Sequence, residues 1–278
     1  PTPPSSQTTL PPVSLPHIET PTLNFVFPST LDLSIPSTLK VYSPAAKSLT
    51  HDQALQTASG LGFSSAPKSF TLPTSETVLL WSEKGKVLSI KLAEAKITYS
   101  NPSSYPGRKF TQTQDQLLQK VSSFINPINK YSPLQLIPHT VVYKLFLTDE
   151  NILPGSLQNS NLARINLSPI IDDFPIIDFS SPNLYSTVSI DTTGQITSAE
   201  IFVPSQLTNP ENRPTLSIEE LQSSVSQAKL INYSNPTTLD APSDIFIGKV
   251  TIKSVALSYL KYPNQAVFLP VFTMEATG

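Results

Sequence analysis

The chain has 278 residues, a formal net charge of −2, 28 prolines, 8 glycines and no cysteine. The missing cysteines exclude a disulfide scaffold, a cysteine-based metal site and a cysteine nucleophile. The near-neutral charge without basic clusters argues against nucleic acid as a partner. No run of apolar residues is long enough to form a transmembrane helix, so we expect membrane contact only through a segment upstream of this chain.

The first 37 residues are rich in proline. They contain nine of the 28 prolines and almost no charged residue. Proline fixes φ and lacks an N–H donor, so it disfavours helices and central strands. We therefore predict an extended Pro/Ser/Thr-rich stalk over residues 1–37. Toward its end, apolar residues alternate, which favours either an edge strand along the folded body or a disordered tail. These residues are Phe25, Phe27, Leu31, Leu33 and Ile35.

Three segments begin with a capping box, in which a Ser or Thr is followed three residues later by Gln or Glu. The boxes start at Thr50, Thr113 and Ser217. Apolar residues follow each box at helical spacing, and an acidic residue in each first turn suits the helix dipole. We predict three short helices. Gly60 and Gly62 are expected to end the first, and Pro127 is expected to end the second.

A first hairpin is predicted from two alternating apolar runs around a Lys-Gly turn. Its strands span residues 77–82 and 87–92, and the glycine of the turn can adopt a positive φ. The second strand is expected to run on to Tyr99. Because the apolar residues change from even to odd positions along it, we expect either a β-bulge near Ala93 or a strand that passes between two packing partners.

A second hairpin is predicted over residues 185–203. In its turn, Asp191 is expected to make an Asx bond, and Gly194 is expected to adopt a left-handed conformation. A calcium-binding loop is the alternative, but the segment lacks the spaced acidic ligands and the final glutamate of such a loop. We therefore favour a turn without a metal.

The remaining strand predictions fall in the middle and at the end of the chain. The last two strands are expected at 247–260 and 266–275, and a change of apolar parity between Ile252 and Val255 predicts a kink in the first of them. Two further strands are expected at 140–147 and 162–177, and the second is interrupted by a bend at 172–175.

This order of elements predicts an α+β fold, with twisted antiparallel sheets that are each covered by short helices. The motif Thr-x-Asp-Gln-x-Leu-Gln occurs twice, which suggests two related units in tandem. We predict three regions. They are a stalk over 1–37, a first α+β unit over 38–105, and an enlarged second unit over 106–278 with a C-terminal helix and hairpin.

These features together resemble PepSY-like extracytoplasmic bacterial proteins of the YycI/YycH type, and the layout also resembles surface proteins of candidate bacterial phyla. Residues 50–99 resemble one unit and residues 111–203 an enlarged second one. The closing segment is similar to the YycI pattern, with a helix, then Ile252-Lys-Ser-Val-Ala-Leu-Ser-Tyr259, then Phe268-Leu-Pro270-Val-Phe272. The resemblance implies an envelope-facing binding or regulatory module. It carries over no residue set as a site.

The sequence contains few residues that suggest chemistry. The histidines, His17, His51 and His139, have no spacing typical of metal ligands, so we assign no metal, cofactor or catalytic residue. The acidic cluster of Asp172, Asp173 and Asp178 has two interpretations. It could supply the paired carboxylates of a glycosidase, but its adjacent aspartates in a proline-terminated bend favour a solvated turn.

Two other side chains have alternative roles. Trp81 could stack on a sugar, but its position in an apolar strand favours the core. Arg164 also lies in an apolar strand, where it would either pair with a carboxylate such as Asp172 or Asp178 or point outward.

The sequence therefore predicts a non-catalytic, exported cell-envelope module that binds a protein or peptide partner and is held off the surface by its proline-rich stalk. The chain starts at Pro1 and not at methionine, so we expect a trimmed product whose N-terminal anchor lies upstream. The alternative is a structural subunit of a surface filament or layer, in which the segment from Phe25 to Ile35 donates a strand to a neighbour. A carbohydrate-active enzyme that uses the Asp172 region is a third interpretation.

Overall fold

The computed structural model describes residues 24–28, 35–45, 48–102, 109–148, 151–178, 186–225, 249–261 and 267–277. Strands hold 52% of the structure and helices 17%, and one large mixed sheet contains fifteen strands. The fold is therefore mostly β. The predicted α+β class, with short helices covering separate sheets in two tandem units, is wrong, because strands from all parts of the chain join one sheet.

The three helices within the described residues are α1 (His51–Gly60), α2 (Gln114–Asn129) and α3 (Ile218–Ser224). The strands are β1 (Asn24–Val26), β2 (Thr38–Pro44), β3 (Lys68–Thr71), β4 (Thr77–Glu83), β5 (Lys86–Lys91), β6 (Lys96–Ser100), β7 (Leu136–Thr148), β8 (Asn151–Pro154), β9 (Leu162–Ile171), β10 (Phe174–Asp178), β11 (Ser186–Asp191), β12 (Ile196–Phe202), β13 (Leu207–Pro214), β14 (Lys249–Lys261) and β15 (Phe268–Thr277).

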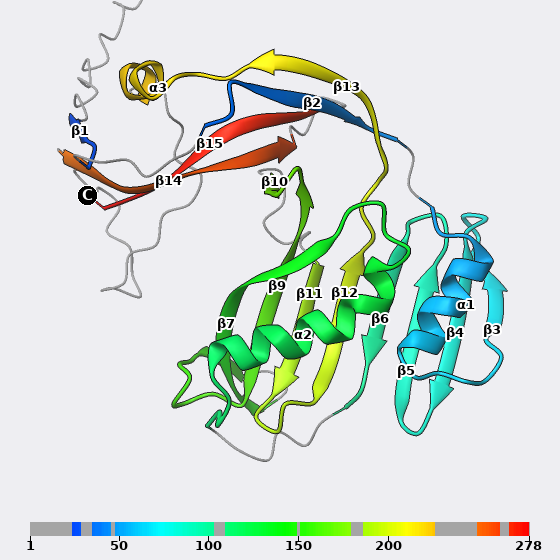
Figure 1. The fold of residues 1–278 in the computed structure, drawn as a ribbon. Coiled ribbons are helices and arrows are strands. Elements are labelled where there is room, and N and C mark those ends of the chain that lie inside the picture. Colours follow the sequence, from blue (N-terminus) through cyan, green and yellow to red (C-terminus); the bar gives the residue numbers. More distant parts are fainter. Residues whose placement is uncertain are drawn as a thin grey trace, which may run out of the picture.

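The strands form two sections, which are easily followed in Figure 1. In the large section, neighbouring strands follow the order β3-β4-β5-β6-β12-β11-β9-β7-β8, and α1 and α2 lie against it. Ile97 of β6 lies opposite Ile201 of β12. This pairing joins strands from either side of the predicted unit boundary near residue 105, which itself lies among residues 103–108, outside the described residues.

The small section has the order β13-β2-β15-β14-β10. It curves above the large section in Figure 1, and the β9–β10 hairpin connects the two sections. β14 is antiparallel to β15 but parallel to β10 and to β1. Phe25 pairs with Val250 in this way, which confirms an edge strand at the end of the proline-rich lead for residues 24–26. The alternating positions Leu31 and Leu33 lie outside the described residues.

All three predicted capping boxes are present, with reciprocal hydrogen bonds between the cap and the third helical residue. Gly62, with φ of +88°, ends α1 as predicted, because Phe63 N–H donates to the Ala58 carbonyl in a Schellman arrangement. The predicted end of α2 is wrong. The helix continues through Pro127 to Asn129, and Lys130 N–H donates to the Asn126 carbonyl beyond the proline.

The two predicted hairpins are confirmed, with one correction to the length of the second strand of the first hairpin. Lys84 and Gly85 form the β4–β5 turn with φ of 51° and 80°. The second strand of this hairpin, β5, does not run on to Tyr99 but ends at Lys91. A turn in which Ala95 has φ of 51° follows it, and β6 then pairs with β5 as a separate antiparallel strand. The change of apolar parity therefore marks a chain reversal and not a bulge.

The later turn predictions are also confirmed. Asp191 Oδ1 accepts from Thr193 N–H at 2.9 Å, and Gly194 has φ of 82° in the β11–β12 turn. The kink in the penultimate strand is a register shift between Ile252 and Ser254 of β14. Local turn residues and parity therefore located these features correctly.

Most of the apolar core lies in the large section. Buried side chains of α1 and α2 pack in one cluster with those of β4, β5, β6, β7, β9, β11 and β12. Trp81 is only 2% exposed within it, which confirms its core role. A separate small cluster lies where the two sections meet, and it consists of Tyr42, Ile171, Ile176, Tyr259 and Phe268.

Candidate functional site: an apolar groove under helix α3

An apolar groove of about 330 Å³ lies on the small section between α3 and the strands β2, β14 and β15. Each of these elements contributes apolar side chains to its walls. Those that define its character are Leu39, Leu221, Leu257, Pro270, Phe272 and Met274. The groove therefore brings together residues from the beginning, the middle and the end of the described chain.

The strand wall follows from the alternation of side chains in β15. Pro270, Phe272 and Met274 occupy every second position, so their side chains share one face of the strand. Leu257 of β14 lies directly opposite Phe272 in the antiparallel register and extends this apolar surface. The three β15 side chains are only partly buried, which leaves an apolar surface in contact with solvent.

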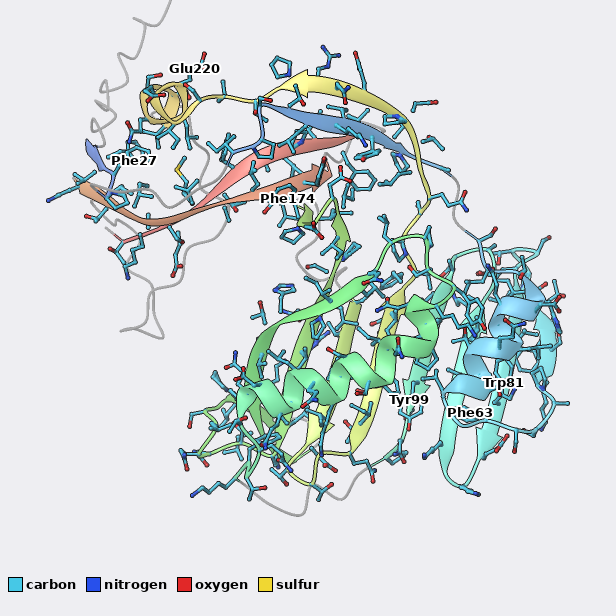
Figure 2. All side chains as sticks on the ribbon, viewed as in Figure 1. Phe27, Phe63, Trp81, Tyr99, Phe174 and Glu220 are labelled. Carbon is cyan, nitrogen blue, oxygen red and sulfur yellow. The ribbon has the colours of Figure 1, made fainter. Side chains whose placement is uncertain are left out.

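Helix α3 forms the other wall and is held by its cap and two apolar residues. The Ser217 hydroxyl accepts from Glu220 N–H at 3.2 Å, and the Glu220 carboxylate accepts from Ser217 N–H at 2.8 Å. Leu221 and Val225 are buried against the strands. A helix of seven residues is too short to be stable alone, so these contacts fix its position above the sheet. Figure 2 shows Glu220 on this helix, at the end of the molecule away from α1.

Leu216 lies at the rim of the groove, immediately before the cap of α3. It lines the groove together with Leu221, and the two leucines have the spacing of a hydrophobic staple around the Ser217 cap. Leu216 nevertheless remains 44% exposed, which is unusual for a large apolar side chain beside other apolar surface. The rim therefore offers a free apolar contact to an incoming molecule.

The hydroxyl groups in the groove wall are already engaged by the backbone. Ser224 Oγ donates to the Glu220 carbonyl at 2.6 Å, and Thr215 Oγ1 donates to the Pro36 carbonyl. The lining contains no histidine, acid or base. Its arrangement therefore suits the burial of apolar groups and provides no nucleophile or general base.

The acidic cluster lies elsewhere. Asp172 and Asp173 form the two-residue turn between β9 and β10, with φ of 48° and 70°. Both are exposed, as the turn interpretation predicts. Two tyrosines bind this turn: Tyr42 donates a hydrogen bond to the Asp172 carboxylate at 2.8 Å, and Tyr259 does so at 3.5 Å. The sequence did not predict these partners, because both tyrosines are far from Asp172 along the chain.

This junction changes the acidity of its two phenols. Burial, together with the hydrogen bond to Asp172 and the charge of that carboxylate, raises the pKa of Tyr42 to about 12. Burial and the same negative charge also raise the pKa of Tyr259. The two rings lie 5.9 Å apart. The cluster therefore connects β2 and β14 to the hairpin turn, and its polar atoms are occupied by one another. The side chain of Asp178 lies outside the described residues.

The histidines are separated in the structure. His51 begins α1, and His17 lies outside the described residues. His139 lies in β7, where its Nε2 is 2.8 Å from Ser168 Oγ and its Nδ1 is 2.6 Å from Thr140 Oγ1. Burial lowers the pKa of His139. A serine beside a histidine is typical of acyl transfer, but Ser168 is only 3% exposed and the third partner is a hydroxyl. We therefore assign this contact to strand packing.

The surroundings of Arg164 and of the acidic and histidine side chains can be described for part of the chain. Arg164 donates to Thr187 Oγ1 at 3.4 Å on the neighbouring strand. It makes no ion pair with Asp172 among the described residues, and the side chain of Asp178, the other carboxylate that we considered, lies outside them. No group of three or more His, Asp or Glu side chains in the described part of the chain is placed to hold a metal ion.

Comparison with protein-family models, with curated proteins and with solved structures finds no match for this chain. Among the described helices, none has the length and apolar character needed to cross a membrane. The apolar groove is thus argued from its own geometry. The sequence signals closest to it were the Leu216–Leu221 staple and the proline in the last strand, but neither indicated a groove.

Proposed function

We propose that this chain is a non-catalytic binding module and that the groove under α3 receives an extended segment of a partner protein. The observation that carries this proposal is the row of alternating apolar side chains along β15, which is covered only in part by α3. An exposed apolar surface of this kind is typical of an interaction site. The inert lining of the groove supports binding in preference to catalysis.

The dimensions of the groove favour an extended segment over a compact ligand. Alternate residues of a strand are roughly 6.6 Å apart, so Pro270 and Phe272 present successive contacts at this spacing. An extended partner also points every second side chain in one direction, and its side chains at i and i+2 match the row. A volume of about 330 Å³ is at the lower end of ligand pockets and suits a few side chains.

The probe for this proposal is a phage-displayed library of random heptapeptides, selected on the immobilised full chain. We expect enriched peptides with apolar residues at alternate positions. A synthetic copy of the best peptide is then titrated by fluorescence anisotropy. Met274→Glu and Leu216→Asp place charge in the groove and at its rim, and each should weaken binding at least about tenfold, which corresponds to about 1.4 kcal/mol.

The matched control is Val142→Glu, which changes a 41% exposed apolar residue on β7, outside the groove. It should leave the peptide affinity unchanged. If the library yields no peptide with this pattern, or if the groove variants bind as tightly as the parent, the groove is not the binding site. Location at the cell envelope stays a prediction that rests on the proline-rich lead.

A second candidate, a structural subunit, is favoured by β1. This strand of three residues pairs with β14 in parallel, and so short a strand could exchange between two copies of the chain. Light scattering during size-exclusion chromatography tests this candidate. A concentration-dependent oligomer that Phe25→Asp abolishes would support it, and a strict monomer at high concentration would exclude it.

A further inference from the structure

A second cleft, of about 520 Å³, lies in the large section. It shares no lining residue with the groove under α3. It forms where the β4–β5 turn and the adjoining ends of β6 and β12 meet α1 and α2. The side chains on which its chemistry depends are Lys84, Lys86, Tyr99, Asn101, Phe124 and Gln195. Unlike the groove, this cleft combines positive charge, amide groups and aromatic rings.

The two lysines are held at the cleft by the hairpin turn. Lys84 and Gly85 have φ of 51° and 80°, which matches a type I′ turn, where asparagine or glycine is usual. The antiparallel register pairs Val87 with Ser100, so Lys86 is next to Asn101 across the strands. The lysine in the left-handed turn position and the lysine that follows the turn thus both line the same cleft.

Neither Lys84 nor Lys86 takes part in any of the ion pairs found in the described part of the chain. The neighbouring Glu83 is occupied, because its carboxylate accepts from Ser65 Oγ and N–H, both at 2.6 Å, and from Ser64 N–H at 2.8 Å. These bonds lower the pKa of Glu83 to about 2. The cleft therefore holds two ammonium groups that make no ion pair among the described residues, and the carboxylate of Glu83 beside them in the hairpin is bound to other donors.

The rest of the lining suits hydroxyl groups and a flat apolar face. Tyr99 and Phe124 form an edge-to-face pair with centroids 5.2 Å apart, and Figure 2 shows Tyr99 beside Phe63 in this part of the molecule. Asn101 donates to the Ile196 carbonyl at 3.3 Å, and its side chain also hydrogen-bonds Tyr99. These two contacts hold the amide in place at the edge of the cleft. Gln195 is exposed and adds both donors and an acceptor.

The end of α1 helps to decide between ligand classes. Gly60 and Leu61, at the C-terminal end of this helix, line the cleft. A helix C-terminus carries partial negative charge, so it favours hydroxyl donors and disfavours a densely charged polyanion. The cleft as a whole therefore suits a ligand that carries an isolated carboxylate among many hydroxyl groups.

We propose that this cleft binds an acidic saccharide of the uronate class. Lys84 and Lys86 neutralise a carboxylate of the sugar, and Asn101 and Gln195 bond its hydroxyl groups. The half-buried ring of Phe124, which packs on the buried Tyr99, contacts the apolar face of a sugar ring. This site is separate from the groove under α3, and saccharide binding here does not require a peptide in that groove.

The test uses isothermal titration calorimetry of the full chain with a galacturonic acid oligomer. Binding should be measurable and should weaken as salt is added, because exposed charges are screened. The double variant Lys84→Gln/Lys86→Gln should bind at least about tenfold more weakly. The matched control, Lys68→Gln on the edge strand β3, also removes one exposed cation from the large section and should bind like the parent.

Two comparison ligands make the outcome decisive. A neutral glucose oligomer should bind much more weakly than the uronate, and polyglutamate should not bind as tightly as the uronate. The proposal fails if the uronate does not bind, if polyglutamate binds equally well, or if Lys68→Gln causes the same loss as the double variant. The groove variant Met274→Glu should leave uronate binding intact, so failure of one site is distinguishable from failure of the other.

Discussion

The two sections of the sheet differ in how completely helices and strands bury their apolar residues. In the large section, α1 and α2 join a core that extends across seven strands. In the small section, the buried cluster has five residues, and α3 covers only part of β15. The large section therefore gains its stability from its own core, whereas the small section leaves an apolar groove open to solvent.

The same substitution in each section provides the strongest test of this difference. Leu117 of α2 is fully buried in the large core, and Leu257 of β14 is buried but lines the groove. We expect Leu117→Ala to lower the free energy of unfolding by about 2–5 kcal/mol, because it leaves a closed cavity. Leu257→Ala should cost less, because its space opens into a groove that water can enter.

Urea denaturation monitored by the fluorescence of Trp81 measures both costs, since this residue is the only tryptophan. Circular dichroism should confirm that both variants keep the parent secondary structure. Equal losses in the two variants would contradict the distinction between a sealed core and a partly open sheet.

The junction of the two sections should be sensitive to alkaline pH. Folding raises the pKa of Tyr42 to about 12, above its unfolded value of about 10, so the native state favours the neutral phenol. This stability is fully present below about pH 10 and is lost as the pH rises toward 12. Tyr42→Phe should therefore make the free energy of unfolding less dependent on pH in this range.

The measurement is urea denaturation at several pH values between 8 and 12. Tyr131→Phe is the control, because Tyr131 is a tyrosine of the large section outside this junction. It should retain the pH dependence of the parent. If Tyr42→Phe loses stability between pH 10 and 12 as steeply as the parent does, the Asp172 junction does not connect the sections as described.

The next prediction concerns the close packing of α1 on α2 in the large section. A methyl group at Gly60 would lie 2.5 Å from the Cβ of Pro127, which is too close without movement of one helix. We expect Gly60→Ala to destabilise the protein by about 1–3 kcal/mol. Ser59→Ala, at an exposed neighbouring position of α1, should have little effect. Thermal unfolding by circular dichroism compares the two, and an unchanged midpoint for Gly60→Ala would show that α1 and α2 can separate freely.

The sequence predicted the features that depend on neighbouring residues. The capping boxes at Thr50, Thr113 and Ser217 bond within three residues, so the helix starts were correct. The end of α2 was wrong because Pro127 packs against Gly60 of another helix, a contact that local pattern does not contain. The α+β assignment failed for the same reason, since pairs such as Ile97 with Ile201 join residues that are far apart in the chain.

The candidate groove was less predictable than the fold. Its walls combine Leu39, Leu221, Leu257 and Phe272, four residues from separate segments that only long-range strand pairing brings together. The sequence predicted a strand over 266–275, but nothing in that segment distinguished a strand face fully covered by a helix from one covered only in part. The proposed saccharide cleft was equally unpredictable, because Lys84 and Gln195 belong to two hairpin turns that are far apart in the sequence.

The smallest expected effects come from the helix caps. Because the same capping box occurs in both sections, one type of substitution can be compared between them. Loss of a cap hydroxyl costs about 1 kcal/mol. Thr113→Ala should lower the free energy of global unfolding by this amount, since α2 is part of the large core. Ser217→Ala should leave global unfolding nearly unchanged but accelerate amide exchange in α3, because that helix is anchored chiefly by Leu221 and Val225. A groove peptide should then bind Ser217→Ala more weakly and Thr113→Ala normally. If both variants lower the free energy of global unfolding equally, α3 unfolds together with the large core, and the groove cannot be destabilised without the rest of the protein.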